Sequence, residues 1–253
     1  MDLDSIQTID AVIEALQQII DEAKRNESPL GYFPALYQKV TIKVKEGIEN
    51  NFFENGPRME KLDVVFAKRY LAAYHADQLG QRTTESWVRA FRLTEQHWPI
   101  VLQHLLMGMN AHINLDLGLA AAQVSTPENI HALATDFRRI NQVLANLVEE
   151  VQEDLAEIWP TWHWVLRRTG KIDDHLIDFS MEIAREGAWE VALNAVKVSP
   201  EDLPVFIAER DAKVARFARR ITHPGWFVQF ALRIIRIGER GNVSSKIEAL
   251  QSN

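Results

Sequence analysis

Two histidines and a carboxylate interrupt the most apolar stretch of the sequence, "LQHLLMGMNAHINLDLGLAAA" at 102–122. In a helix that turns by about 100° per residue, His104, His112 and Asp116 lie within an arc of about 120°. Zinc, iron and manganese all accept imidazole and carboxylate ligands, and an incomplete protein shell leaves a position for water. Because a bound divalent metal lowers the pKa of such water, these three residues predict a metal-dependent hydrolase.

Gly108 falls between the two histidines on the same predicted face. Glycine inside a helix costs up to ~1 kcal/mol relative to alanine, so it usually has a local reason there. We expect it to open a hollow between the two imidazoles, with Gly108→Leu harmful and Gly108→Ala mild.

Asp63 is the preferred fourth ligand, or the partner that orients a ligating histidine. It lies in "RMEKLDVVFAKRYLAAYHADQ", where we predict a long helix over 58–77, and shares a face of this helix with Tyr70 and Asp77. The alternative is a solvated acidic face with local pairs to Arg58 and Arg69.

Three further residues are candidates for catalysis. Asp136, in "DFRRIN", is a second carboxylate for the site, although it could equally pair with Arg138 or Arg139. Arg69 or Arg185 could neutralise an anionic substrate, since a guanidinium binds anions well.

A metal is not the only interpretation of these residues. The alternative is a metal-free helical binding or cyclisation protein, whose apolar cavity holds a lipid-like ligand. In a third interpretation, the same residues form a hydrogen-bonded network inside a structural or interaction module.

The elements that must position these residues are helical almost throughout. Apolar residues recur at helical spacing along most of the chain, and Pro99 stands at a favoured first position of a helix. Val40, Ile42 and Val44 alternate as in a strand, but the residues on either side of them follow a helical pattern. We therefore predict an all-α fold, a single domain over 1–253, built as a multi-helix bundle around a central buried helix at about 99–122. The N-terminal helix within 1–30 and the C-terminal helix and tail at 225–253 are expected to be peripheral.

The aromatic and arginine-rich "WFVQFALRIIRIGER" superficially suggests a helix lying on a membrane, but we expect its apolar face to pack on the core.

Composition excludes several classes of protein. A net charge of −7 argues against a nucleic-acid partner, and the absence of cysteine excludes thiolate metal sites and cysteine nucleophiles. No signal pattern and no uninterrupted apolar span are present, so we expect a cytoplasmic protein without stable membrane insertion.

The expected partner is a small-molecule substrate, anionic or lipid-like; the oligomeric state stays open. Without a glycine-rich phosphate loop or a nucleophile elbow, familiar nucleotide-dependent enzymes are not expected.

Several blocks of the sequence resemble an uncharacterised, mainly bacterial, all-helical family, a domain of unknown function. The resemblance extends over roughly 31–221, and "GMNAHINLDLG" is its most specific block; the others are "GYFPALYQKVT", "RMEKLDVVFAKRYLAAY", "DFRRIN" and "FSMEIAREGAW". It implies no known activity.

His112 and Asp116 are also similar to the His-x-x-x-Asp element of the zinc-dependent phospholipase C and P1-nuclease group. The chain lacks that group's second His-x-x-x-acid element and its ligating N-terminal tryptophan, so the similarity serves only as an analogy.

Overall fold

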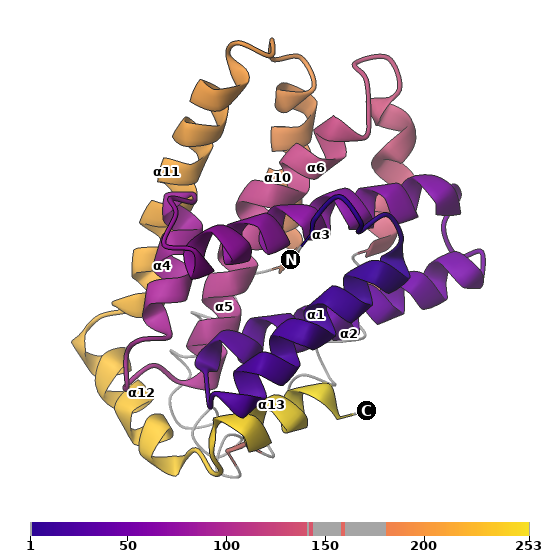
Figure 1. Ribbon diagram of the computed structural model, residues 1–253. Helices are drawn as coiled ribbons and strands as arrows, with labels where there is room; N and C mark the ends of the chain where they lie inside the picture. The colour runs from indigo at the N-terminus through magenta and orange to yellow at the C-terminus, as the bar shows by residue number, and fades with distance from the viewer. Residues whose placement is uncertain (1, 141, 144–157, 160–180, 253) are drawn as a thin grey trace.

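A computed structural model describes residues 2–140, 142–143, 158–159 and 181–252 of the chain (Figure 1). These residues form helices and no strand, which confirms the predicted all-α fold. The helices are α1 (Ile9–Arg25), η1 (Pro29–Gly31), α2 (Tyr32–Glu49), α3 (Gly56–Gln78), α4 (Glu85–Leu93), α5 (Val101–Ala111), η2 (His112–Leu117), α6 (Gly118–Gln123), η3 (Ile130–Leu133), α10 (Met181–Ala195), α11 (Leu203–Thr222), α12 (Trp226–Gly238) and α13 (Val243–Gln251).

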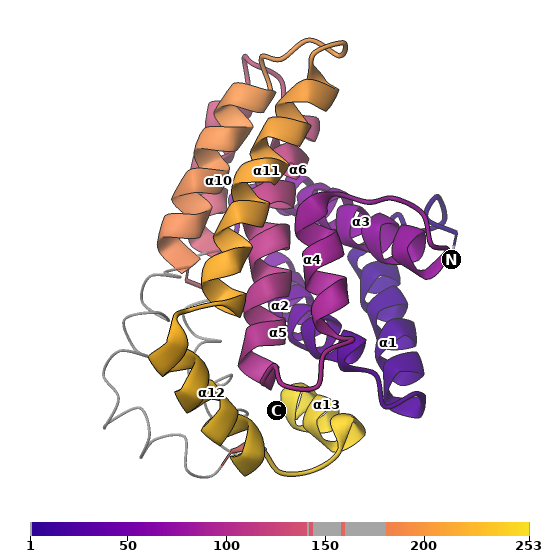
Figure 2. The ribbon, with the colours of Figure 1, turned by 90° about the vertical axis from the view of Figure 1, so that its left-hand side faces the viewer.

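The helical segments α5, η2 and α6 follow one another without a break and lie in the middle of the molecule. Helices α2, α4 and α11 pack against α5, while α3 and α10 pack against η2 and α6 (Figures 1 and 2). The stretch that carries the chemical side chains is therefore enclosed by five other helices.

The predicted uniform α-helix at 99–122 is wrong in its middle, because His112–Leu117 is π-helical. A π-helix closes its hydrogen bonds over one residue more than an α-helix, so the faces of the helix on either side are rotated relative to each other. Such segments are rare and often mark functional sites. The two sequence candidates His112 and Asp116 both lie in this segment.

Five helices receive a carboxylate from a distant segment at their N-terminus. The first N–H groups of a helix have no partner within the helix and carry a partial positive charge, so a carboxylate satisfies both their hydrogen bonding and their charge. The contacts are Glu60 to Ile9 N of α1, Asp136 to Glu54 and Asn55 N before α3, Asp211 to Glu85 and Ser86 N of α4, Glu239 to Val101 N of α5, and Glu27 to Val243 and Ser244 N of α13. These acidic residues therefore fix the helices relative to one another.

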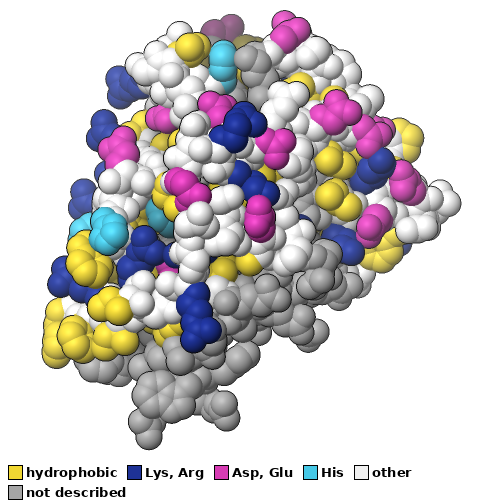
Figure 3. All heavy atoms as spheres, turned by 60° about the horizontal axis from the view of Figure 1, so that its bottom comes forward, with side chains coloured by type: hydrophobic (Ala, Val, Ile, Leu, Met, Phe, Trp, Pro, Cys, Tyr) yellow, Lys and Arg dark blue, Asp and Glu magenta, His cyan; other side chains and the backbone are white. Residues whose placement is uncertain are grey.

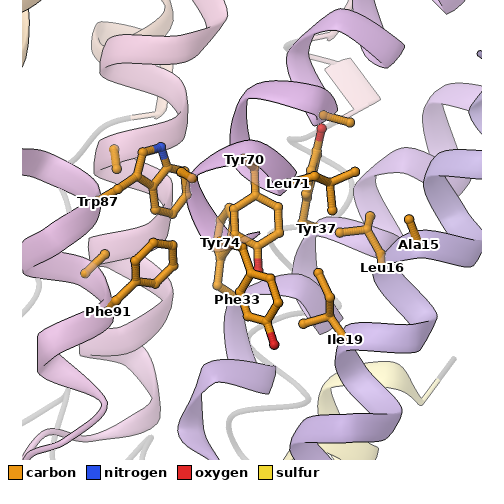
Figure 4. Packing of buried hydrophobic residues seen from close by; sticks show 14 of the residues in the cluster. Ala15, Leu16, Ile19, Phe33, Tyr37, Tyr70, Leu71, Tyr74, Trp87 and Phe91 are labelled. Carbon is orange, nitrogen blue, oxygen red and sulfur yellow. The ribbon is translucent and has the colours of Figure 1, made fainter. Parts of the chain in front are cut away.

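An aromatic core lies between α1, α2, α3 and α4. Figure 4 shows rings from three of these helices gathered together, with aliphatic side chains of α1 beside them. The cluster includes Phe33, Tyr37, Tyr70, Tyr74, Trp87, Phe91, Leu16 and Ile19. Several of these rings surround His112, so the core of the fold is also the wall of the candidate site.

The C-terminal region, predicted as a helix and a tail at 225–253, has a second helix where the tail was expected. It forms two helices, α12 and α13, separated by a turn that contains Gly241 with a φ of 80°. No helix within the described ranges is long and apolar enough to cross a membrane.

Candidate functional site

Asp116 is a buried carboxylate held by donors from two other helices. Arg69 Nε of α3 donates to Oδ1 at 2.9 Å, and Trp87 Nε1 of α4 donates to Oδ2 at 2.8 Å. The Arg69 guanidinium compensates the charge of Asp116, since an unpaired carboxylate at this depth would be costly. The two contacts fix the carboxylate in one orientation.

His112 lies one helical turn before Asp116 and faces the same carboxylate. Its Nδ1 is 3.4 Å from Asp116 Oδ2, a long hydrogen bond, and its ring stacks on Phe66 with centroids 3.6 Å apart and planes at 7°. Burial lowers the pKa of His112; Asp116 opposes this shift and Arg69 adds to it. The imidazole is therefore neutral at neutral pH.

The two nitrogens of His112 have different roles. Asp116 can only accept a hydrogen bond, so it favours the tautomer with the proton on Nδ1. Nε2 then carries a lone pair, and this atom is buried without a hydrogen-bond partner. An imidazole oriented by a carboxylate in this way is the arrangement used for general-base catalysis.

Tyr37 and Asp63 carry two further buried polar atoms without a hydrogen bond, the Tyr37 hydroxyl and Asp63 Oδ2. The Tyr37 ring lies 4.5 Å from the imidazole of His112, and Asp63 acts electrostatically on Tyr37. Burial, with the negative charges of Asp63 and Asp116, raises the pKa of Tyr37, and the Thr41 side chain opposes this shift. Burial also raises the pKa of Asp63 to about 7, with a smaller contribution from Glu60. Each group is thus a neutral hydrogen-bond donor for at least part of the time at neutral pH.

Two side chains of α3 separate this site from solvent. Phe66 covers the imidazole of His112, and Arg69 covers the carboxylate of Asp116; both are partly exposed and lie three residues apart on α3. The His112–Asp116 pair therefore lies one layer of side chains below the surface.

His104 lies away from this pair. It is eight residues before His112, about 12 Å along an α-helix, and its ring contacts Tyr32 at 5.5 Å. Burial lowers its pKa to about 3, with Arg236 and Lys246 adding to the shift. Its Nδ1 is buried without a partner.

The four predicted metal ligands, His104, His112, Asp116 and Asp63, are not brought together as one group. In the part of the chain that the structure describes, no three His, Asp or Glu side chains are placed to hold a metal ion. The physical reason is visible at His104, whose distance along the helix gives it neighbours from a different part of the core.

Besides Asp63, three residues were predicted to be catalytic, and they lie in different places. Asp136 is fully buried but accepts from the backbone N–H groups of Glu54 and Asn55, so it serves the start of α3 rather than the candidate site. Arg69 is at the site, but its charge is engaged by Asp116. Arg185 lies in α10, and its side chain is outside the described residues.

Gly108 does not open a hollow between the imidazoles. A Cβ at this position would lie 2.3 Å from Phe33 Cδ2 and 2.9 Å from Phe33 Cβ, so the Phe33 ring already fills the space. The same ring packs edge-on against His112 at 5.7 Å. Gly108 therefore allows Phe33 to approach and shape the wall around His112.

Sequence reasoning missed three residues of the site, Tyr37, Phe66 and Trp87. Tyr37 lies in "ALYQKVTIKVKEG", whose alternating Val40, Ile42 and Val44 obscured the helical pattern. Phe66 and Trp87 look like ordinary core residues in sequence. One signal in the sequence could have identified Trp87. A buried indole N–H usually finds an acceptor, and Asp116, in a predicted buried helix, is such an acceptor.

The comparisons with known proteins give one finding. A model of a "Family of unknown function (DUF5995)" matches residues 9–224, which is most of the chain. No curated protein matches the chain, and no solved structure does. The match includes the whole candidate site and ends before α12.

Proposed function

Because the chain belongs to DUF5995, a family of unknown function, we infer its activity from the site and propose a metal-free enzyme. The proposed reaction moves a proton on a small, largely apolar carbonyl compound. The observation that carries the proposal is His112, whose Nδ1 faces Asp116 while its Nε2 is buried and unpaired. The proposal develops the metal-free interpretation of the sequence rather than the interpretation as a metal-dependent hydrolase.

The unpaired atoms support a role in binding. A buried polar atom without a hydrogen bond costs ~1–3 kcal/mol, so a cluster of them is costly unless a ligand completes it. His112 Nε2, the Tyr37 hydroxyl and Asp63 Oδ2 are three such atoms. The Tyr37 ring contacts the imidazole, and Asp63 is close enough to raise the pKa of Tyr37.

The chemistry of the three groups is complementary. His112 Nε2 would accept a proton from a carbon next to the carbonyl, and Asp116 would stabilise the imidazolium that forms. The Tyr37 hydroxyl or the protonated Asp63 would donate a hydrogen bond to the carbonyl oxygen as negative charge develops there. Return of the proton to another atom of the substrate would give an isomer.

The aromatic surroundings fit an apolar substrate. Phe33, Phe66, Tyr70 and Trp87 all have rings within about 6 Å of the imidazole centroid, between 3.6 and 6.1 Å. A dry, apolar site strengthens the hydrogen bonds that stabilise developing charge. Since Phe66 and Arg69 cover the pair, we expect a substrate to enter by displacing the Phe66 ring.

The direct test follows the tautomer of His112 by ¹⁵N NMR of histidine-labelled protein. In the wild type, we expect the proton on Nδ1 and none on Nε2. Asp116→Asn keeps the shape but can present an N–H to the ring, so we expect the tautomer to change. The exposed His131 should be unaffected in both proteins, and its resonances are the internal control.

The activity test measures deuterium exchange from heavy water into a panel of small cyclic ketones, followed by mass spectrometry. Wild-type protein should accelerate exchange above buffer, and His112→Phe should remove the acceleration. Exchange by His112→Phe equal to that of the wild type, or a His112 tautomer protonated on Nε2 in the wild type, contradicts the proposal.

The metal-dependent hydrolase stays a hypothesis, and metal content distinguishes it. If the proposal is right, protein purified without chelator should exchange deuterium equally before and after dialysis against a chelator. About one equivalent of metal that is lost in His112→Ala, measured by mass spectrometry of the metals, would favour the hydrolase instead.

A further inference from the structure

Helix α12 exposes a second apolar face in addition to the face that packs on the core. Val228, Leu232 and Ile235 are buried in the core cluster beneath it. On the other side, Phe230, Ile234 and Ile237 have exposed fractions of 61%, 51% and 77%. Their spacing of four and three residues places them on one face. The expectation that the apolar face of this helix packs on the core holds for Val228, Leu232 and Ile235 but not for Phe230, Ile234 and Ile237.

Two tryptophans extend this face. Trp98, in the loop before α5, is 51% exposed and lies under the guanidinium of Arg233 at 5.6 Å. Trp226, at the start of α12, is 84% exposed. We call Trp98, Trp226, Phe230, Ile234 and Ile237 the α12 surface. Contiguous apolar exposure of this kind marks an interaction site, whereas single exposed apolar residues need no explanation.

The α12 surface lies in the most basic part of the chain. Between residues 213 and 240, the sequence has seven Lys or Arg and one acidic residue, although the whole chain has a net charge of −7. The side chain of the acidic residue, Glu239, is buried and paired with Arg236 and Lys246, so it does not offset the exposed cations. Arg233 and Arg240 are exposed on α12 and just beyond it, and Arg216, Arg219 and Arg220 are exposed on α11.

The view from below shows the two features together. In Figure 3, apolar side chains gather at the lower left of this face, with Lys or Arg side chains along their border. Figure 2 shows that α12 follows directly from the lower end of α11, which brings the basic residues of α11 toward the same end of the molecule.

We propose that the α12 surface binds an anionic membrane surface, with α12 lying flat in the headgroup region. The charge pattern favours this occupant, because exposed arginines beside Trp, Phe and Ile side chains are the features with which interfacial helices bind anionic lipid. The aromatic rings suit the boundary between headgroups and acyl chains. This is adsorption to one leaflet, and it is compatible with the absence of a spanning helix in the described ranges.

The experiment is sedimentation with lipid vesicles, using the full chain. We compare vesicles of phosphatidylcholine alone with vesicles that contain about a third phosphatidylglycerol, a lipid with one negative charge. Wild-type protein should sediment with the anionic vesicles and not with the neutral ones. Raising the salt to about 1 M shortens the screening length to about 3 Å and should release much of the bound protein.

Two sets of variants test which residues are responsible. The triple variant Phe230→Ser, Ile234→Ser, Ile237→Ser should reduce the partition coefficient by at least about tenfold, since each apolar side chain contributes when buried in lipid. Arg233→Gln with Arg240→Gln should reduce binding to anionic vesicles by about tenfold or more. The matched control is Leu79→Ser with Val205→Ser, which removes two side chains of 57% and 60% exposure elsewhere and should bind as the wild type does.

Circular dichroism and thermal unfolding must first show that each variant is folded. Equal binding by the wild type and the triple variant overturns the proposal, as does the absence of binding to anionic vesicles. Sedimentation velocity without lipid tests whether a second copy of the chain binds the α12 surface instead. If the wild type is a dimer, the triple variant is a monomer and neither binds vesicles, the α12 surface is a dimer interface.

Discussion

The indole nitrogen of Trp87 donates to Oδ2 of Asp116 at 2.8 Å, joining α4 to the π-helical segment in the centre of the molecule. Both side chains are buried, and the same oxygen faces His112 Nδ1. The orientation of the candidate base therefore depends on a tryptophan that sequence reasoning treats as an ordinary core residue.

Trp87→Phe should destabilise the protein by ~2–4 kcal/mol. The substitution removes a donor from a buried carboxylate and leaves space in the core, and both changes cost free energy. Trp98→Phe, at a half-exposed tryptophan, is the control and should change the free energy of unfolding by less than about 1 kcal/mol. Urea denaturation measures both; a Trp87→Phe protein as stable as the wild type would show that the contact contributes little.

Gly108→Ala should destabilise the protein by ~1–3 kcal/mol, unlike the mild effect expected from sequence, because the added methyl group meets the Phe33 ring. Phe33→Leu makes room beside it. The double variant should therefore cost less than the sum of the two single substitutions, and a double-mutant cycle by chemical denaturation measures the difference. Additive costs would mean that the two positions do not interact.

The raised pKa of Asp63 predicts a pH-dependent stability. With a pKa of about 7 in the folded protein and about 3.9 when unfolded, the folded state binds more protons between these values. The free energy of unfolding therefore contains a contribution that falls as pH rises from about 4 to about 7. His104 has the opposite effect, because its pKa is about 3 in the folded protein and about 6.5 when unfolded. Its contribution to the free energy of unfolding therefore rises as pH rises from about 3 to about 6.5.

Asp63→Asn isolates the first contribution. The variant should gain stability relative to the wild type as pH rises through this window, by on the order of 3 kcal/mol at pH 8 compared with pH 4. Comparison at each pH cancels the effect of His104. The exposed Asp21→Asn is the control and should run parallel to the wild type, and an Asp63→Asn curve that also runs parallel would contradict the assignment.

The carboxylates at helix N-termini predict a loss of stability when one of them is replaced by an amide. Asp211→Asn replaces one acceptor oxygen with an N–H group facing the backbone N–H of Glu85 or Ser86, so it should cost ~1–3 kcal/mol. Asp136→Asn should cost a similar amount for the same reason, without changing deuterium exchange per folded molecule. Glu201→Gln, at an exposed position, should be neutral. Loss of exchange in folded Asp136→Asn would return Asp136 to the list of catalytic residues.

The fold class and the central stretch could be predicted from sequence because they depend on local patterns. Apolar residues at helical spacing identify buried faces without knowledge of partners. The predicted helix 58–77 corresponds closely to α3, Gly56–Gln78. The alternation at Val40, Ile42 and Val44 is ambiguous in sequence, because packing against α1, α3, α5 and α13 decides that α2 is a helix.

The candidate site could be predicted only in part. His112 and Asp116 are four residues apart, so their proximity follows from helix geometry. The partners Arg69, Trp87 and Tyr37 come from three other helices, and no local rule relates them to Asp116. The expected role of Gly108 failed for the same reason, since Phe33 is distant in sequence.

The hydroxyl of Tyr37 provides the last prediction, which separates a ligand site from a structural network by the sign of a stability change. Replacing both His112 and Asp116 with leucine does not make this separation, because loss of Asp116 leaves Arg69 and Trp87 without their acceptor whatever the function. Tyr37→Phe removes only a buried hydroxyl that has no partner.

Tyr37→Phe should therefore leave the free energy of unfolding unchanged or raise it, because groups retained for function are often unfavourable for folding. Thr222→Val is the control. It removes a partly buried hydroxyl of α11 that donates to Ala218 O at 3.2 Å, and it should cost up to about 1 kcal/mol. In the exchange assay, Tyr37→Phe should lower the rate and Thr222→Val should not. A Tyr37→Phe protein that loses several kcal/mol would show that the hydroxyl belongs to a satisfied network, and the acid–base proposal would lose one of its two donors.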